Sequence, residues 1–480
     1  MTNQTNSRLL LLTLIAFMLD GCAAGPDYKR PSTDIPAAYK EAQGWKTAEP
    51  RDEISRGNWW EIYGDLELNS LVKQVEISNQ NVRAAEAQHR EALALLGVAR
   101  ASYFPVLSAG ASATRGQGTS AAPATGATVV SPGAPIRNTD RLSLSASWEA
   151  DVWGQIGRNV ESNDASVMAS AADLQAALLS AQSTLVQSYL QLRINDAQRR
   201  LFEQIIAAYD RSLQITRNRY EAGVAARLDV AQAETQLKSA QAQAVDLGVQ
   251  RAQLEHAIAM LIGKAPANFQ IKPIDTIPTL PETPVGLPSE LLERRPDIAG
   301  AERRMAASNA QIGVAQAAFF PALMLSATGG YQNSSFSQLL TLPNQFWSLG
   351  PSLALTLFDA GARSAQKDLA IASYDKSVDT YRQTVLAAFQ EVEDNLAALR
   401  ILANEEEAQK AAAVLAAEAW DITDNQYQSG TVSYLNVVIA QATALTTAKS
   451  RLDITSRRLV ASAVLLTALG GGWRASGSKP

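Results

Sequence analysis

Cysteine and histidine are scarce in this chain, which has one cysteine and two histidines among 480 residues. One cysteine cannot form an internal disulfide, and three soft ligands are too few for a Cys/His metal site. The net charge is −5 and the positive residues are dispersed, so the sequence lacks the basic footprint of a nucleic-acid-binding protein. We therefore expect no metal site and no nucleic-acid partner.

Features of an enzyme are also missing. His89 and His256 lie in separate Ala/Leu-rich segments without a paired nucleophile. The acidic residues around Glu391 and in the run 405–407 are typical of solvated helix faces rather than of an acid/base pair. No glycine-rich phosphate loop is present, so the chain does not itself use ATP. We expect a protein that is not an enzyme and has no cofactor other than a covalent lipid.

Proline and glycine are absent from two long zones. Residues 158–222 and 364–429 contain neither, and at ~1.5 Å per residue each zone could form a helix approaching ~100 Å. Core-type residues in the first zone alternate in spacing between three and four, which is typical of a coiled coil. They are Ala171, Leu174, Leu178, Ala181, Leu185, Ser188 and Leu192. Long paired helices fit this pattern better than an ordinary helical bundle.

A short apolar run opens the chain. Residues 9–19 are too few to span a bilayer and suit the core of a signal peptide, predicted over 1–21. Leu19-Asp20-Gly21-Cys22 resembles a lipobox, which implies diacylglycerol and an N-acyl chain such as palmitate on Cys22. Asp20 departs from the usual small residue there, so an ordinary secreted protein with an incidental cysteine is the alternative. Ala23 resembles the pattern of lipoproteins sent to the outer membrane.

The chain repeats itself. Residues 81–111 align with 297–327 with eleven identities in 31 positions, and Tyr220-x-x-Gly223 recurs as Tyr427-x-x-Gly430. Two copies of one unit are therefore predicted: helix, strand pair, very long helix, turn, returning helix. The predicted divisions after the signal peptide are an N-terminal segment (22–70), a first repeat (71–265), a proline-rich connector (266–296), a second repeat (297–469) and a flexible tail (470–480).

Alternating apolar and polar residues predict two strand pairs, at 105–116 with 140–153 and at 321–332 with 346–358. One apolar face is typical of a transmembrane β-barrel, although a soluble two-layer sheet also alternates. Four strands leave open edges that lipid cannot accommodate, so several chains must share one barrel. The connections near 117–139 and 333–345 are expected to be extracellular loops. The predicted lipid-facing residues are Leu142, Leu144, Trp148, Val152, Trp347, Leu349, Leu353, Leu355 and Leu357.

Seven short motifs carry a family resemblance: CAAGPDYKRP (22–31), NWWEIYGD (58–65), WEADVWG (148–154), GLPSELLERRPDIAGAE (286–302), AAFFP (317–321), FQEVEDNLA (389–397) and LGGGW (469–473). The chain resembles the TolC-type outer-membrane factors of tripartite efflux and type I secretion systems, and within them the OprM and NodT lipoprotein branch. The resemblance implies a homotrimer that shares a 12-stranded barrel, four strands per chain, continuous with an α-helical coiled-coil tunnel. It also implies the outer membrane of a Gram-negative bacterium, with the tunnel in the periplasm.

The resemblance answers why the Tyr-x-x-Gly motif occurs twice. Tyr220 with Gly223, and Tyr427 with Gly430, resemble the turns of helical hairpins at the periplasmic tip, where glycine supplies φ > 0. Several relatives carry aspartates six and nine residues after the second glycine, and here those positions hold uncharged residues. The gate candidates are Arg227, Asp229, Tyr434, Asn436 and Ile439. Asp229 has the compatible alternative of a helix N-cap.

The resemblance implies a passive exit duct for drugs and other toxic small molecules, and hence a part in antibiotic resistance. Its partners would be a periplasmic adaptor protein, an inner-membrane pump of the RND type and outer-membrane lipid. A self-standing porin or structural lipoprotein is the alternative, but a porin would need many short strands and no very long helices. The sequence does not specify the exported substrates.

Overall fold

The computed structural model describes residues 24–31, 58–117, 136–274, 276–281 and 295–471. The predicted signal peptide, Cys22 and most of the predicted C-terminal tail lie outside these residues. The chain forms two compact units, and each unit draws on both sequence repeats. One comprises Met1–Pro31, Arg90–Met168 and Glu302–Asp379; the other comprises Ser32–His89, Ala169–Ala301 and Thr380–Pro480.

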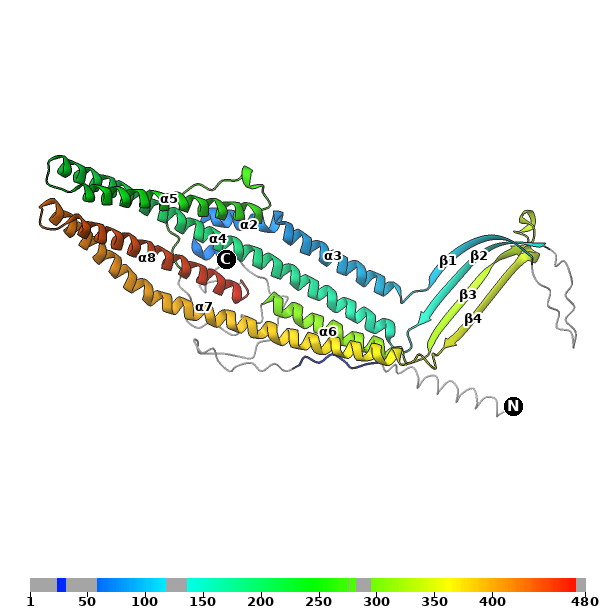
Figure 1. Ribbon diagram of the computed structural model, residues 1–480. Coiled ribbons are helices and arrows are strands. Elements are labelled where there is room, and N and C mark those ends of the chain that lie inside the picture. The colour runs from blue at the N-terminus through cyan, green and yellow to red at the C-terminus, as the bar shows by residue number, and fades with distance from the viewer. Residues whose placement is uncertain (1–23, 32–57, 118–135, 275, 282–294, 472–480) are drawn as a thin grey trace. The chain divides into compact units, whose positions relative to one another are not determined.

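The first unit contains a four-stranded antiparallel sheet in the order β1-β2-β3-β4 (Figure 1). Its strands are β1 (Val106–Gln117), β2 (Ile136–Ala150), β3 (Ala322–Asn333) and β4 (Gln345–Ala354). β1 and β3 each begin directly after a proline, which lacks the N–H that a ladder requires. In the order β1-β2-β3-β4 the two outer strands are β1 and β4, and each pairs with only one neighbouring strand within the chain.

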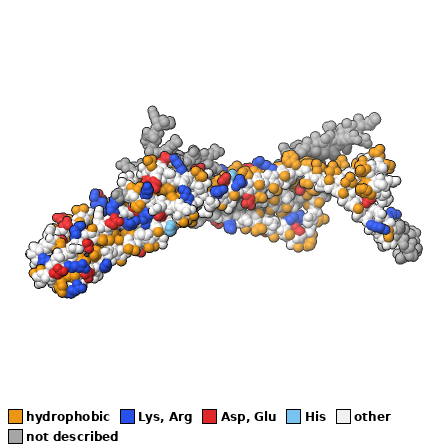
Figure 2. All heavy atoms as spheres, turned by 90° about the horizontal axis from the view of Figure 1, so that it is seen from above, with side chains coloured by type: hydrophobic (Ala, Val, Ile, Leu, Met, Phe, Trp, Pro, Cys, Tyr) orange, Lys and Arg blue, Asp and Glu red, His pale blue; other side chains and the backbone are white. Residues whose placement is uncertain are grey.

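The strand register places the predicted apolar residues on one face. Leu144 pairs with Ala109 and Gly329, and Gly329 pairs in turn with Trp347. Directly paired residues point to the same side of a sheet. The residues on this face that were predicted to contact lipid are Leu142, Leu144, Trp148, Trp347, Leu349 and Leu353, and all are exposed in the single chain. Figure 2 shows hydrophobic side chains gathered over the strands at the right of the view, with few charges among them.

The strands end earlier than the alternation predicted, so Val152, Leu355 and Leu357 are not strand residues. Beyond Ala150 the chain turns, and Val152 N–H donates to the Ala150 carbonyl at 2.8 Å. β4 ends at Ala354, opposite the first residue of β3, because the residue before β3 is Pro321. Apolar alternation continues past both points, but no ladder partner is available there.

The helices repeat in length. The two copies are α3 (Gln80–Ala101) and α6 (Pro296–Ala317), with 22 residues each; α4 (Gln155–Glu221) and α7 (Ala362–Gln428), with 67 each; and α5 (Arg227–Leu261) and α8 (Tyr434–Ala468), with 35 each. The short helices η1 (Trp59–Tyr63) and α2 (Leu66–Ser78) precede the first copy. Among the described residues, no helix combines the length and the apolar character needed to cross a membrane.

Two hydrophobic clusters form the core of the second unit. In the first, η1 and α2 pack on the long helices; its fully buried members include Leu68, Leu185, Tyr189, Ile258 and Leu459. The second cluster lies toward the turns that join α4 to α5 and α7 to α8. It includes Phe202, Tyr209, Leu213, Val230, Leu237, Tyr427, Tyr434 and Val437.

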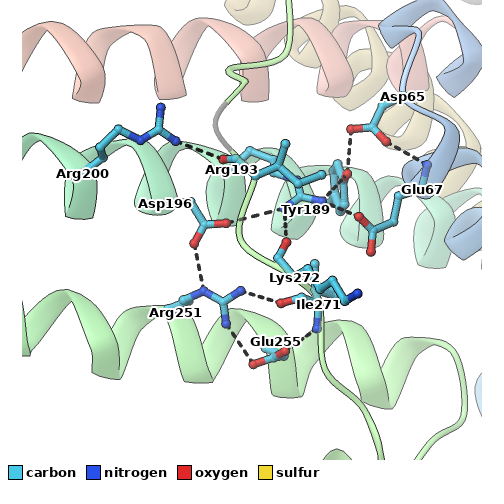
Figure 3. Close-up of polar contacts among 11 residues, drawn as sticks. Asp65, Glu67, Tyr189, Arg193, Asp196, Arg200, Arg251, Glu255, Ile271 and Lys272 are labelled. Carbon is cyan, nitrogen blue, oxygen red and sulfur yellow. Dashed lines mark hydrogen bonds and ion pairs between the residues drawn. The ribbon is translucent and has the colours of Figure 1, made fainter.

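A buried charged network holds part of the connector between the repeats (Figure 3). Arg193 on α4 is 1% exposed and donates to the Glu67 carboxylate at 2.6 Å, the Tyr189 hydroxyl at 2.7 Å and the Lys272 carbonyl at 2.9 Å. Asp196 accepts from Arg251 at 2.8 Å. The network therefore joins the start of α2 to α4, to α5 and to the connector.

The same network reaches the neighbouring connector residue from α5. Arg251 donates to the Ile271 carbonyl at 2.7 Å, and the Ile271 N–H donates to the Glu255 carboxylate. Tyr189 donates to Asp65 at 2.6 Å, and burial together with that hydrogen bond raises the pKa of the Tyr189 hydroxyl. Because each buried charge has an oppositely charged or polar partner, the cost of burial is offset.

The N-terminal segment 24–31 packs within the first unit. Ala24 N–H donates to the Trp153 carbonyl at 3.0 Å, and Asn309 of α6 donates to the Pro26 carbonyl at 2.9 Å. Arg158 of α4, buried beside them, donates to the Ala24 carbonyl at 3.2 Å and to Asp27 at 2.8 Å. The segment is thus bound through its backbone to two helices.

Candidate functional site at the helix tips

The turn between α4 and α5 is built around Gly223. Its φ is +76°, in the left-handed region where a side chain is unfavourable. The Gly223 N–H donates to the Tyr220 carbonyl and the Val224 N–H to the Arg219 carbonyl, both at 2.9 Å. These two bonds define a Schellman motif, which satisfies the last carbonyls of α4 and reverses the chain.

The turn between α7 and α8 repeats this geometry. Gly430 has a φ of +78°, its N–H donates to the Tyr427 carbonyl at 2.9 Å, and the Thr431 N–H donates to the Gln426 carbonyl at 2.9 Å. The doubled sequence motif therefore encodes the same turn twice, as the spacing of tyrosine and glycine suggests.

The two tyrosines have different environments. Tyr220 is 44% exposed, whereas Tyr427 is 4% exposed and lies edge-on to Tyr434 with ring centroids 5.1 Å apart. Tyr434 is itself buried, its hydroxyl lies 3.3 Å from the Ser212 hydroxyl of α4, and burial raises its pKa. Within one chain this gate candidate is a core residue of the tip and does not reach solvent.

Arg219 links the two tips. Its Nη1 donates to the Gln428 carbonyl at 2.7 Å, and its guanidinium carbon lies 4.8 Å from the centroid of the Tyr427 ring. The first bond satisfies a carbonyl in the last turn of α7, where a cation is also favourable for the helix dipole. The equivalent residue of the second repeat is Gln426, so the second hairpin has no arginine at this position that could make the reciprocal contact.

Sequence reasoning missed Arg219 because it compared the two copies for identities. The difference between Arg219 and Gln426, directly before the shared tyrosine, was the available signal. A residue that differs between the two otherwise repeated turns marks a position where the two turns make different contacts.

Asp229 acts on the start of α5 from inside the helix. The helix begins at Arg227 with Ala226 as its N-cap, so Asp229 is the third helical residue and not the N-cap itself. Its carboxylate accepts from the Ala226 N–H at 3.3 Å, which satisfies one free donor of the first turn. The capping role predicted for Asp229 is thus performed from the third helical position rather than from the N-cap, and the residue remains partly exposed.

The other gate candidates are exposed in the single chain. Arg227 follows the first turn, while Asn436 and Ile439 lie on the first turns of α8; Ile439 is 57% exposed. On α4 and α5 the charge of Arg217 is paired with Glu234 at 2.6 Å, and that hydrogen bond holds the pKa of Glu234 below its ordinary value. Asn436 is the counterpart of Asp229 in the second repeat, so the second tip presents an uncharged side chain where the first presents an aspartate.

Contacts between the hairpins continue away from the turns. The Tyr209 hydroxyl donates to the Gln441 carbonyl at 3.2 Å, and the Tyr209 ring meets Trp420 edge-on with centroids 5.9 Å apart. Burial raises the pKa of Tyr209 to about 12. Gln441 Nε2 donates to Ser212 Oγ at 3.4 Å. Side chains of α4, α7 and α8 thus interlock over the distal part of the second unit.

In the part of the chain that the structure describes, no three or more His, Cys, Asp or Glu side chains gather to hold a metal ion. His89 shares a hydrogen bond with Ser170 at 2.9 Å, which gives it a structural partner. What the tips provide is two identical turns, joined by one cation and surrounded by exposed apolar side chains.

The family model and the relatives that match this chain are all described as outer membrane proteins. The family model described as "Outer membrane efflux protein" matches residues 71–264 and 287–471. A pyoverdine export outer membrane protein of Pseudomonas aeruginosa, OpmQ, is 31% identical over 97% of this chain and 97% of its own length. A probable efflux pump outer membrane protein of Pseudomonas putida, TtgC, is 28% identical over 97% and 96%.

Solved structures agree with the sequence comparisons. The outer-membrane channel OprN superposes with a TM-score of 0.85 and 31% identity, covering 94% of this chain and all of that one. CusC superposes with a TM-score of 0.83 and 26% identity over 94% and 100%. The four strands, the paired helices and their order are therefore those of a known channel architecture.

Proposed function

Because the chain belongs to the outer membrane efflux protein family and is an exit duct of tripartite efflux pumps, we propose that three copies form one conduit whose periplasmic end is closed by the tips described above. The protein lies in the outer membrane with its helical tunnel in the periplasm. Small molecules would pass through it without chemical change, so the energy for export comes from a partner.

One observation carries this proposal: a single chain contributes a sheet that cannot stand alone in lipid. β1 and β4 each have one unpaired edge within the chain, and one face of the sheet is apolar and exposed. Unpaired backbone groups in hydrocarbon cost several kcal/mol each. Pairing β4 of one copy with β1 of the next removes both edges and yields a 12-stranded barrel from three chains. Four strands in the described chain also disfavour a self-standing single-chain porin.

The partners we propose are a periplasmic adaptor that packs around the tips and an inner-membrane transporter of the RND type. Relatives with near-equal identity are described as exporting toluene, pyoverdine and cations. Because cargo varies so widely across ducts of one architecture, we infer that this chain imposes little selectivity and that the transporter chooses the cargo.

Photo-cross-linking from the tip tests the docking surface. A photoreactive residue would replace Thr431, which is exposed beside Gly430, and captured proteins would be identified by mass spectrometry. The control places the same residue at Val414, which is 59% exposed within α7. We expect an adaptor and its transporter from Thr431 only. Recovery of the chain alone, in cells that express the pump, would reject the tip as a docking site.

A lipid on Cys22 is the second part of the proposal. The described chain starts two residues later, where Ala24 binds the Trp153 carbonyl just after β2, so an acyl anchor there would lie close in sequence to a segment fixed beside the sheet. Radiolabelled palmitate should enter the wild-type chain and not Cys22→Ser. Equal labelling of both chains would place the lipid elsewhere.

A further inference from the structure

Charged residues are rare in the strand regions of this chain. Between positions 105 and 147, and between positions 321 and 358, the charged residues are Arg115, Arg137, Asp140 and Arg141. All four lie toward the end of β1 or the start of β2. Since α3 leads into β1 and α4 follows β2, these strand ends are the ones away from the helices (Figure 1). With the helical tunnel in the periplasm, this is the extracellular end of the sheet.

The strand register divides these charges between the two faces of the sheet. Arg137 and Arg141 are out of phase with Leu142 along β2, so both point away from the apolar face. Asp140 is in phase with Leu142 and points to the apolar face. The pairing of β1 with β2 puts Arg115 on the apolar face as well. The polar face thus receives two of the four charges, and both are positive.

Arg141 contacts an aromatic ring on the polar face. Its guanidinium carbon lies 4.5 Å from the centroid of the Phe346 ring of β4. β3 runs between these two strands, and Gly330, which pairs with both Ser143 and Phe346, has no side chain to separate the cation from the ring. An aromatic face attracts a guanidinium without neutralising its charge. The nearest acidic residue on this face of β2 is Glu149, eight residues or roughly 26 Å along the strand.

We propose that Arg137 and Arg141 form a cationic ring on the inner wall of the barrel, near its extracellular mouth, that concentrates anionic solutes such as carboxylates in the exit and depletes cationic ones. The inference rests on the proposed function, in which three chains close one barrel with the apolar face toward lipid. The polar face then lines the lumen, and two arginines from each of three chains give a ring of six. Rings of arginine or lysine side chains give pores a preference for anions.

The width of the barrel decides how far this ring can act. Twelve strands about 4.8 Å apart and tilted by about 40° enclose a cylinder with a backbone radius of roughly 12 Å. The Debye length is ~10 Å at 0.1 M salt, so the field of the ring reaches most of the lumen, but at 1 M salt it falls to ~3 Å. The ring therefore sorts solutes by charge at low ionic strength. It does not sort them by size or shape, which leaves the choice of cargo to the transporter.

A thiol beside the ring measures its field. Ser143→Cys adds a cysteine on the polar face of β2, two residues from Arg141. An anionic and a cationic methanethiosulfonate reagent are applied to intact cells from outside, and the parent chain, whose one cysteine is Cys22, gives the background rate. We expect the anionic reagent to be favoured. Adding Arg137→Gln and Arg141→Gln should lower the anionic-to-cationic rate ratio by about tenfold at ~0.1 M salt.

The matched control is Arg115→Gln, which removes the same charge at the same level of the sheet but from the opposite face. It should leave the rate ratio unchanged. Lysine at both ring positions, Arg137→Lys with Arg141→Lys, keeps the charge and should keep the ratio. Survival of the trimer on heated gels checks that each variant assembles. An equal change with Arg115→Gln, or an assembled glutamine double variant with the wild-type ratio, would overturn the ring.

Reversal potentials in planar bilayers test the ring during conduction. Under a gradient of potassium chloride at low ionic strength, the glutamine double variant should shift the reversal potential toward cation preference relative to the wild type. The shift should disappear at ~1 M salt, where the field is screened. If the wild type forms no pore, the three-chain conduit fails, while the thiol rates still report on the charges. If the wild type conducts but the arginines change neither measurement, the conduit stands and the ring fails.

Discussion

Gly25 and Gly313 approach each other so closely that a Cβ placed on Gly25 would lie 2.4 Å from the Gly313 Cα. Gly313 in turn faces the Ala24 carbonyl and the stem of Arg158, which a Cβ would meet at 2.7 and 2.8 Å. Gly25 also has a φ of +95°. Two glycines therefore let the N-terminal segment lie directly against the backbone of α6, where Arg158 holds it.

Substitution of Gly313 by alanine should displace this segment. The added methyl overpacks a site bounded by backbone, and we expect the free energy of unfolding to fall by ~1–3 kcal/mol. Limited proteolysis of residues 24–31 and thermal unfolding of the purified trimer would measure the change. The repeat supplies the control: Gly97, the counterpart of Gly313, has open space around its Cβ position. Gly97→Ala should be neutral or slightly stabilising; equal loss in both variants would contradict the close-approach explanation.

Valine at Gly430 should strain the second tip turn. The Cβ position there has only the end of Arg219 nearby, at 3.7 Å, so the effect comes from the left-handed backbone and amounts to ~1–2 kcal/mol. Asn tolerates this conformation, so Gly430→Asn should be milder. Drug efflux in cells and single-channel conductance are the measurements. Gly248→Val, in open space within α5, is the control. Unchanged efflux and conductance in Gly430→Val would remove Gly430 from the tip machinery.

Replacement of Arg193 by methionine should destabilise the second unit strongly. The change leaves Glu67 and the Lys272 carbonyl without their buried donor, which typically costs ~3–5 kcal/mol. Arg199→Met, which removes an exposed ion pair with Glu203 at 3.9 Å, should cost less than ~1 kcal/mol. Chemical unfolding followed by circular dichroism compares the two. The double variant Glu67→Gln/Arg193→Met should recover part of the loss, and strict additivity of the two changes would argue against a coupled network.

Acid should weaken the contact between α7 and α8. Partial burial opposes the charge of Glu406, but hydrogen bonds from Arg458 and Thr455 prevail and hold its pKa below the ordinary value. The stabilisation from Glu406 is therefore complete above the unfolded pKa of about 4.5 and is lost as pH falls through the lower folded pKa. Unfolding midpoints measured from pH 6 to pH 3 should decline less in Glu406→Gln than in the wild type. The exposed neighbour offers Glu407→Gln as a control, which should follow the wild-type curve.

Much of the fold follows from the sequence because its signals are local. Missing prolines and glycines predict the long helices, alternation predicts the strands, and the repeated motif predicts two turns with glycine at φ > 0. Strand ends were less predictable: apolar alternation runs on past Ala150 and Ala354, while the ladder stops where a turn or Pro321 removes the partner. The end of a strand pair depends on both strands, so the residue pattern of one strand cannot predict it.

Packing across distant segments was the part that local patterns could not supply. The predicted coiled-coil positions Leu185 and Leu192 are fully buried, but so are Val186, Tyr189 and Leu190 between them. The additional burial comes from η1 and α2, which cover a second face of α4. Arg219 was missed for a related reason, since its partner lies 209 residues away in the other hairpin.

The matched helix lengths constrain how this protein can change by insertion. From the start of β1 to the start of α4 is nine residues longer than from β3 to α7, since the repeats are offset by 216 residues before that stretch and by 207 after it. Everywhere else the paired helices agree to the residue. One residue added to α4 alone would rotate all later side chains by ~100° and advance the turn by ~1.5 Å, so Arg219 would no longer face Gln428. Length variation between the two copies is therefore confined to the second strand of each pair and its connections, whereas the helices keep matched lengths.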